Sequence, residues 1–452
     1  KKKKTYENYT ETPSLWIDTL PAEWKSKKVR ELFIERRTKV SDKDFSPLSV
    51  CKAGIVPQLE SAVKTDNGDN RKLVKNGDFV INSRSDRKGS SGISSLDGSV
   101  SLINIVLKPI TNEHPKFFHY LLRSVPFAEE YYRNGRGLVS DLWTTRYSEL
   151  KNVFLPIPPR EEQDQIVRFL DWKTSEMAHF IHEKKKEIRR LEELKKSIVN
   201  QAVTKGLNPT VTMQETGIDW LPQIPAHWEK CSLRQFLVAK SKKNYPDMPL
   251  LSVTRELGVI VRDVDDSESN HNYIPDDLNG YKLVKNGQFV INKMKAWQGS
   301  YGVSKHDGIV SPAYFVFDLN FENKDYFHFA IRSRVYVNFF AQYSDGIRTG
   351  QWDLSIQKLK SIPFFVPPLE EQNEILSSVP SKIEDINQLI SSLKKEIALV
   401  QELRTKTISD VVTGKVDVRG VIVPDYVPEE DEVDLDEELN ESEEDIKEED
   451  DD

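Results

Sequence analysis

The sequence contains little cysteine and no long apolar run. Its 452 residues include only two cysteines, Cys51 and Cys231, which are too few for a disulfide framework and suit a reducing compartment. No stretch approaches the roughly 18 consecutive apolar residues of a membrane-spanning helix, and no charged-then-apolar signal peptide opens the chain. These absences argue against a secreted disulfide scaffold and a helical membrane protein. They predict a cytoplasmic protein of about two to four domains.

Motifs of the common catalytic classes are also missing. The chain has no Walker A loop, no GxGxxG loop after a strand and no GxSxG nucleophile elbow. Gly414 and Lys415 lack both the upstream glycine and the following Ser or Thr that would hold a phosphate. His179 and His182 lack a third metal ligand nearby in the sequence, so we interpret the pair as an exposed helix face. We therefore expect a chain that is not an enzyme and carries no metal or cofactor of its own.

Negative charge is concentrated at the C-terminus. The formal net charge is −8, yet residues 429–452 hold 17 acidic residues and one lysine, a net of −16. The preceding 428 residues carry 63 basic and 55 acidic residues, a net of +8. A block of like charge is typically disordered and solvating, and we expect that state for residues 428–452. The rest of the chain is mildly basic.

The chain contains an internal duplication. Residues 71–82 read RKLVKNGDFVIN and residues 281–292 read YKLVKNGQFVIN, with ten of twelve positions identical at an offset of 210. A Pro-Pro-x-Glu-Glu-Gln segment occurs at 158–163 and again at 367–372, an offset of 209. Further matches follow in the same order in both halves. The sequence therefore predicts a tandem duplication of a unit of about 205 residues, far too long for a solenoid repeat.

The residue pattern changes once within each copy, from short β-rich runs to a long helix. Its first 150 or so residues contain short β-rich runs separated by Asn-Gly and Asp-Gly turns, with short amphipathic stretches between them. This pattern predicts an α+β domain, which ends at the Pro-Pro pair. A long helix follows, and its Glu-Glu-Gln places negative charge in the first turn, where the helix dipole favours it. We thus predict α+β domains at 11–158 and 215–367, and long helices at 159–206 and 368–415.

Both long helices carry a heptad pattern in one shared register, which predicts a coiled coil. Seven of ten core positions are apolar in the first helix and eight of ten in the second. These positions are Leu170, Thr174, Met177, Ile181, Lys184, Ile188, Leu191, Lys195, Ile198 and Ala202, then Val379, Ile383, Ile386, Ile390, Leu393, Ile397, Val400, Arg404, Thr407 and Val411. Two arrangements are possible: the helices pair with each other, or each packs on its own domain. The apolar stripe is narrow, which favours pairing. At ~1.5 Å per residue, each would span about 65 Å.

Basic loops follow the repeated strand in both copies, at 83–90 and 293–300. The preceding strands are nearly identical, whereas the loops diverge while both stay basic, as expected for two sites of different specificity on one fold. Arg, Lys and Gln grip phosphates or read base edges. Solvated hairpin loops without a ligand remain the alternative. The candidate contact residues, from these loops and two further loop pairs, are Lys52, Arg84, Arg87, Lys88, Arg136, Arg255, Lys293, Lys295, Trp297, Gln298, Arg348 and Gln351.

An ordered set of motifs resembles a known family. Residues 217–228 read GIDWLPQIPAHW, residues 202–207 read AVTKGL, and the Pro-Pro-x-Glu-Glu-Gln segment occurs twice. With the repeated strand pair, these motifs resemble the specificity (S) subunits of type I restriction-modification systems. The resemblance extends over residues 11–415 and covers both copies.

The resemblance implies two α+β target-recognition domains, each reading one half of a bipartite, asymmetric DNA sequence. The two long helices would form an antiparallel coiled coil that fixes the spacing between half-sites. Two modification subunits, which bind S-adenosylmethionine and methylate adenine N6, and two restriction subunits, which use ATP and Mg, would dock on the chain. The alternative is a non-DNA scaffold whose duplicated domains bind proteins. The resemblance does not explain the acidic tail, which could compete with DNA phosphates for the basic loops.

Overall fold

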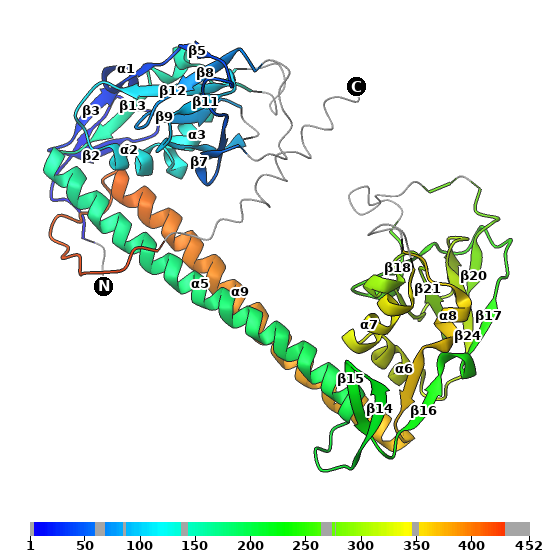
Figure 1. Ribbon diagram of the computed structural model, residues 1–452. Helices are drawn as coiled ribbons and strands as arrows, with labels where there is room; N and C mark the ends of the chain where they lie inside the picture. Colours follow the sequence, from blue (N-terminus) through cyan, green and yellow to red (C-terminus); the bar gives the residue numbers. More distant parts are fainter. Residues whose placement is uncertain are drawn as a thin grey trace. The chain divides into compact units, whose positions relative to one another are not determined.

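The computed structural model describes residues 4–58, 68–84, 87–136, 143–263, 274–275, 277–345 and 352–429. By its internal contacts the chain divides into two units, the first made of residues 1–186 and 393–452 and the second of residues 187–392. Both boundaries fall inside the long helices α5 (Arg160–Lys205) and α9 (Leu369–Val412). Each unit therefore contains one α+β domain and one end of each long helix (Figure 1).

The first unit is built from short antiparallel strands and short helices. A four-stranded sheet has the order β10-β9-β12-β4, and a three-stranded sheet has the order β11-β8-β5. The strands are β1 (Tyr9–Glu11), β2 (Thr19–Pro21), β3 (Lys25–Lys28), β4 (Phe33–Glu35), β5 (Lys39–Val40), β6 (Leu48–Cys51), β7 (Gly54–Pro57), β8 (Arg71–Val74), β9 (Phe79–Asn82), β10 (Ser91–Ile93), β11 (Gly98–Val100), β12 (Asn104–Pro109) and β13 (Phe154–Ile157). The short helices are α1 (Val29–Leu32), α2 (Pro115–Leu121), α3 (Val125–Arg133) and α4 (Tyr147–Leu150).

The second unit repeats this plan. Its four-stranded sheet, β17-β24-β21-β22, has the same order as β4-β12-β9-β10 in the first unit. The strands are β14 (Met213–Ile218), β15 (Leu221–Pro225), β16 (Glu229–Ser232), β17 (Leu237–Lys240), β18 (Leu251–Thr254), β19 (Gly258–Val261), β20 (Lys282–Val284), β21 (Gln288–Ile291), β22 (Tyr301–Val303), β23 (Gly308–Val310), β24 (Phe315–Leu319) and β25 (Pro363–Val366). The short helices are η3 (Leu233–Gln235), η4 (Ala296–Gln298), α6 (Lys324–Ile331), α7 (Arg334–Tyr343) and α8 (Ile356–Ser361). The duplication in the sequence is thus a duplication of the fold.

The repeated twelve-residue motif forms two strands joined by a tight turn. The turn glycines, Gly77 and Gly287, have φ angles of 88° and 81°, a backbone conformation that glycine adopts without steric cost. After the turn, side chains alternate between two cores. Phe289 and Ile291 lie in the large core of the second unit, while Val290 faces a smaller core behind the sheet.

The ends of the long helices complete the large core of each unit. In the first unit, Leu170 near the start of α5 and Val411 near the end of α9 belong to the same buried cluster. In the second unit, Val203 near the end of α5 lies in one cluster with Val379 near the start of α9. Because opposite ends meet in each unit, the helices pair antiparallel (Figure 1).

The heptad register agrees with this pairing. All twenty predicted core positions are buried or partly buried, and none is exposed. Where lysine interrupts the apolar pattern, Lys184 Nζ lies 3.2 Å from Glu396 Oε2 of the other helix. Arg404 lies close to Tyr120 of the first domain, and burial lowers the pKa of its guanidinium. The helices therefore pair with each other and also pack on the domains at their ends.

The Glu-Glu-Gln motif has a structural role beyond the helix dipole. Gln163 Nε2 donates to the carbonyl oxygen of Pro158 at 2.9 Å, and Gln372 Nε2 donates to that of Pro367 at the same distance. Both glutamine side chains are buried. Each therefore satisfies a carbonyl just before its helix begins and fixes the angle at which the chain enters it.

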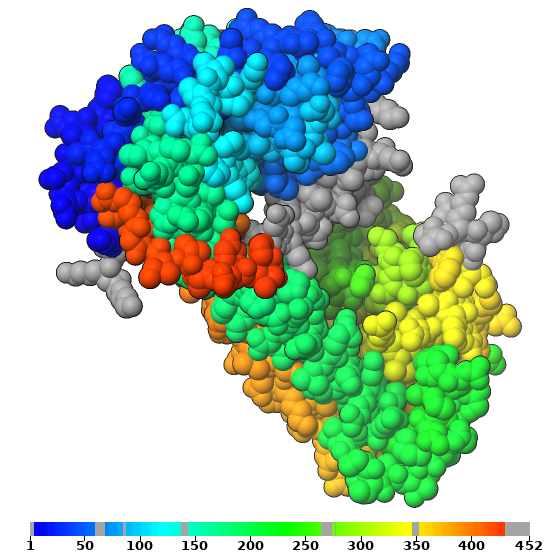
Figure 2. Space-filling view, turned by 60° about the vertical axis from the view of Figure 1, so that its left-hand side comes forward, coloured from blue at the N-terminus to red at the C-terminus, as the bar shows by residue number. Residues whose placement is uncertain are grey.

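A C-terminal segment, residues 413–429, continues beyond α9 and lies along α5 in the first unit (Figure 2). Gln165 Nε2 of α5 donates to the carbonyl of Val421 at 2.7 Å, and the backbone N–H of Glu429 donates to Ser175 Oγ at 2.7 Å. No pattern in the sequence predicts these contacts. Of the predicted acidic tail, only residues 428 and 429 lie within the described part of the chain.

Candidate nucleic-acid interface

In the first domain the structure brings two of the predicted basic loops side by side. Arg136 and Thr144 exchange backbone hydrogen bonds of 3.2 and 3.1 Å, and Arg84 forms a β-bridge with the same Thr144. The next residue, Thr145, donates its N–H to the carbonyl of Ser83 at 3.0 Å. The loop after β9 and the loop after α3 therefore form one surface. Arg136 is highly exposed there, with 84% of its side chain accessible.

Tyr132, at the end of α3, supports the same surface from below. Its hydroxyl donates to the carbonyl of Arg87 at 3.0 Å, and Lys88 Nζ lies 5.8 Å from the centre of its ring. This geometry fits a cation–π contact, which restrains the ammonium while leaving Lys88 exposed. The ring thus fixes one loop backbone and one loop cation together.

The second domain joins the equivalent loops by different contacts. Lys293 Nζ pairs with the Asp353 carboxylate at 2.8 Å, and the rings of Trp297 and Trp352 lie 5.3 Å apart at 54°. Backbone hydrogen bonds of 3.0 and 2.7 Å between Asp345 and Asp353 close the second loop. The two domains thus share the placement of the loops but not their side chains.

The remaining candidates of the second domain differ in exposure. Lys295 is exposed, whereas Trp297 and Gln298 are partly buried within the short helix η4. Lys293 is engaged by Asp353, so its charge is partly neutralised before any ligand arrives. Arg348 and Gln351 lie outside the described residues.

The third pair of candidates occupies the tips of two hairpins. Lys52 lies between β6 and β7, and Arg255 lies between β18 and β19. Both side chains are exposed, and Arg255 Nε is 3.7 Å from the neighbouring Glu256 carboxylate. The carbonyls of both tip residues accept hydrogen bonds from a partly buried arginine, Arg123 or Arg332. The backbone at each hairpin tip, which carries the exposed cation, is therefore held by hydrogen bonds from an arginine.

These two arginines, with a histidine one turn before each, are residues that the sequence motifs did not single out. His119 and Arg123 recur as His328 and Arg332 at an offset of 209, and that shared offset is the signal that could have identified them. In a single copy, one histidine and one arginine near the end of an amphipathic helix would not indicate a functional site.

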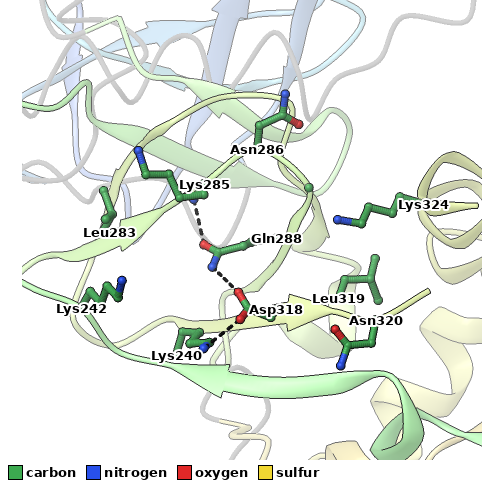
Figure 3. A pocket seen from close by; sticks show the side chains of 11 residues that line it. Lys240, Lys242, Leu283, Lys285, Asn286, Gln288, Asp318, Leu319, Asn320 and Lys324 are labelled. Atoms are coloured by element: carbon green, nitrogen blue, oxygen red, sulfur yellow. Dashed lines mark hydrogen bonds and ion pairs between the residues drawn. The ribbon is translucent and has the colours of Figure 1, made fainter. Parts of the chain in front are cut away.

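Four lysines surround a hollow of about 420 Å³ in the second domain, at the opposite end of β21 from the Lys293 loop (Figure 3). The lysines are Lys240, Lys242, Lys285 and Lys324. Asp318 lies in the floor, where its carboxylate accepts from Gln288 Nε2 at 2.6 Å and pairs with Lys240 Nζ at 2.9 Å. Both contacts lower the pKa of Asp318.

The first domain has similar ion pairs at the corresponding place. Arg36, which directly follows the edge strand β4, pairs with Asp78 at 2.6 Å, and Lys75 pairs with Asp97 at 2.6 Å. Lys285 and Asp307 repeat the second pair at 2.8 Å. Both copies thus place a carboxylate against the basic residue at the end of the edge strand. The network joins strand ends and adds positive charge to the second domain.

The described residues offer cations and hydrogen-bond donors rather than catalytic chemistry. Both cysteines are buried, and burial raises the pKa of the Cys231 thiol to about 11, which keeps it protonated and unreactive. No group of three potential metal ligands gathers within the described ranges. His179 and His182 instead lie 2.6 and 3.9 Å from the Glu429 carboxylate. Such surfaces suit the binding of a polyanion.

Comparison with known proteins supports the resemblance over part of the chain. Residues 21–190 match the family model described as the type I restriction modification DNA specificity domain. The resemblance inferred from the sequence motifs is thereby confirmed.

Two curated relatives of the specificity family come from Methanocaldococcus jannaschii. The type I restriction enzyme MjaVIII specificity subunit is 24% identical over 290 residues, which cover 60% of this chain and 64% of the relative. The putative type I restriction enzyme MjaX specificity subunit is 24% identical over 332 residues, which cover 70% of this chain and 71% of the relative. The chain thus matches a little under two thirds of the length of the first of these relatives.

A solved structure confirms the fold class. A chain from a type I restriction-modification system, studied for its complex assembly and conformational transition, has a TM-score of 0.59 and 13% sequence identity. The match covers 87% of this chain and 98% of that one. The α+β fold with two long helices is therefore shared. Within the described ranges, no helix combines the length and apolar character needed to cross a membrane.

Proposed function

We propose that this chain is the DNA sequence-recognition subunit of a type I restriction-modification complex and has no catalytic activity of its own. One observation carries the proposal: each of the two domains gathers basic loops at the same place on equivalent sheets, with different side chains in the two copies. The match of residues 21–190 to the DNA specificity domain model supports DNA as the ligand class.

Each domain reads one half of a bipartite target in this proposal. The contacts between the loops, Arg84 and Arg136 around Thr144 in one copy and Lys293 with Asp353 in the other, differ in geometry and charge. Base discrimination depends on such side chains, with each bidentate contact contributing ~1–3 kcal/mol. Different loops on one scaffold therefore predict two different half-sites and an asymmetric target.

The partners follow from the resemblance and remain part of the proposal. Two modification subunits with S-adenosylmethionine and two restriction subunits with ATP and Mg would assemble on the chain in the cytoplasm. The paired helices, whose seam is apolar over most of its length, would fix the separation of the half-sites. Methylation and cleavage would then be reactions of the partners.

A salt titration with the modification subunit present tests the proposal. Sequence-specific duplex binding should weaken linearly as log salt rises, with a slope of about −0.9 per phosphate contacted. Arg136→Ala, which removes an exposed loop cation, should reduce the slope by about one. Lys415→Ala, which removes an exposed cation just beyond α9, is the matched control and should leave it unchanged. Absent or salt-insensitive duplex binding would instead favour a protein-binding scaffold.

A further inference from the structure

Each α+β domain places a histidine and an arginine beneath the tip of one hairpin. In the second domain His328 lies in the last turn of α6 and Arg332 is its C-cap residue. In the first domain His119 lies in the last turn of α2 and Arg123 follows two residues after that helix ends. In each pair the arginine donates hydrogen bonds to backbone carbonyls of the tip.

Arg332 connects three elements through backbone carbonyls. Its Nη2 donates to the carbonyl oxygens of Arg255 and Glu256, both at 2.8 Å, and its Nη1 donates to that of Tyr301 at 2.6 Å. Arg255 and Glu256 form the β18–β19 tip, and Tyr301 begins β22. A planar guanidinium with fixed donor directions therefore sets the orientation of the tip relative to the sheet.

Burial keeps the histidine beside each arginine neutral. His328 Nδ1 accepts the N–H of Val303 at 3.0 Å, and burial, aided by Arg332, lowers its pKa to about 4. In the first domain His119 Nε2 lies 2.9 Å from Arg123 Nη1, and burial lowers the pKa of His119 to about 3. Arg123 Nη2 donates to the carbonyl of Lys52. Each domain thus places a neutral histidine and a carbonyl-bonded arginine under a candidate DNA-contacting cation.

Glycines make the close approach possible. A Cβ on Gly258, whose φ is 76°, would lie 3.1 Å from Arg332 Nη1, and a Cβ on Gly302 would lie 3.1 Å from His328 Cε1. The first domain has glycines at both matching positions, Gly54 and Gly92, where a Cβ on the latter would lie 3.2 Å from the Cα of the former. We call His328, Arg332, Gly258 and Gly302, with their first-domain counterparts His119, Arg123, Gly54 and Gly92, the tip clamps.

Stability alone does not explain a tip clamp. Arg332 is partly buried and makes no ion pair within the described ranges, and desolvation lowers its pKa. Burying a charge against carbonyls is costly, and apolar residues of similar volume often stabilise a fold as well or better. The guanidinium instead fixes the direction of two consecutive carbonyls. It thereby also fixes the direction of the side chain at the tip.

We propose that Arg123 and Arg332 are positioning residues for DNA recognition: without touching DNA, they orient the tips that carry Lys52 and Arg255 and thereby set discrimination at their half-sites. The proposal rests on the function proposed above. The side chains that face the duplex differ between the copies, whereas the clamp beneath them is common. Each clamp acts within its own domain and on its own half-site.

This inference can be tested by selection from a random-sequence duplex library, which samples all candidate targets. The full-length chain serves as bait, and the modification subunit is present. The unmodified chain should select a bipartite consensus. Arg332→Lys keeps the charge but loses the planar fork, so the first half-site should persist while sequence preference at the second declines. The ratio of affinities for the selected duplex and one with a scrambled second half should drop about tenfold. Arg123→Lys should produce the mirror-image result.

The controls separate positioning from a general loss of structure. Arg334→Lys makes the same change at an exposed position two residues away and should leave the consensus and the melting temperature unchanged. If Arg332→Lys does not fold, Arg332→Gln, whose amide can still donate to one carbonyl, replaces it.

The outcomes distinguish this inference from the proposed function. An unmodified chain that selects no sequence overturns the function itself. A bipartite consensus that Arg332→Lys leaves unchanged, or that it weakens equally in both halves, overturns the positioning role while the function stands. Loss at the second half alone, with nonspecific affinity preserved, supports it.

Discussion

Trp297 and Trp352 lie with their ring centroids 5.3 Å apart and join the two loops that form the candidate interface of the second domain. Trp297 belongs to the loop after β21, whereas Trp352 follows the loop after α7. Beside them, Lys293 Nζ reaches the Asp353 carboxylate at 2.8 Å. The two loops therefore form a single interface in the second domain. A substitution in either loop should change the conformation of the other loop but not that of the first domain.

Substitution of Lys293 or Gln298 by alanine should change the second half-site only. Lys293→Ala also leaves the Asp353 carboxylate without its 2.8 Å partner, which would repel a nearby phosphate. We expect a loss of about 5- to 150-fold in discrimination at the affected positions, the equivalent of ~1–3 kcal/mol. Binding to duplexes with one scrambled half-site at a time measures this. Lys88→Ala is the matched first-domain variant, and equal losses at both half-sites would contradict separate reading.

Removal of one heptad should change the tolerated spacing between half-sites. Because Lys184 faces Glu396 across the helix pair, the deletion of residues 184–190 should be combined with that of 393–399. Seven residues at ~1.5 Å each shorten the pair by about 10 Å, close to 3 base pairs at ~3.4 Å each. Selection from a library with variable spacers measures the shift. An unchanged spacer, with both half-sites intact, would show that the helices do not set the distance.

The buried His328 should make the second unit less stable in acid. Its pKa is lowered to about 4 in the folded chain against about 6.5 when unfolded. Below pH 6.5 the unfolded chain takes up a proton that the folded chain refuses. The free energy of unfolding should therefore fall by up to about 3 kcal/mol as pH drops from 6.5 to 4.

Unfolding in urea at several pH values measures this effect. His328→Asn retains an oxygen that can accept the Val303 N–H and cannot titrate in this range, so it should flatten the dependence. His306→Asn, at an exposed position, is the control and should leave the slope as it is. A slope in His328→Asn as steep as in the unmodified chain would mean that other groups dominate.

Truncation should reveal whether the acidic tail competes with DNA. A chain that ends at Val427 would also lose Glu429, whose backbone N–H bonds Ser175 and whose carboxylate lies beside His179. A chain that ends at Glu429 keeps these contacts and removes only residues 430–452, most of which are acidic. If the tail shields the basic loops, both truncations should raise nonspecific duplex affinity at low salt. Unchanged affinity would leave the tail a role in solubility alone.

The duplication and the helix pairing were predictable because they depend on periodicity and order along the chain. The heptad positions, from Leu170 to Val411, follow from a repeat that constrains every residue of a paired helix. Even the interruption at Lys184 has a partner in Glu396 across the seam. Patterns of this kind are set by the spacing of residues along the chain and need no tertiary contact to be visible.

The contacts around the candidate site were not predictable in the same way. The adjacency of Arg84, Arg136 and Thr144 depends on how three distant segments converge, and no local pattern encodes it. The bonds between the C-terminal segment and α5, such as Ser175 with Glu429, are equally non-local. The role of a loop residue depends on the scaffold that positions it, which a single sequence does not show.

The division of the chain has a consequence for how its specificity can change. Residues 187–392 form one unit as a single uninterrupted stretch of sequence, entered through α5 and left through α9. Both crossing points lie in the heptad pattern, whose register the two copies share. One contiguous gene fragment could therefore be exchanged between relatives, with both joins inside regular helix. If each domain reads one half-site as proposed, such an exchange would yield a new combination of half-sites and leave both recognition domains unchanged.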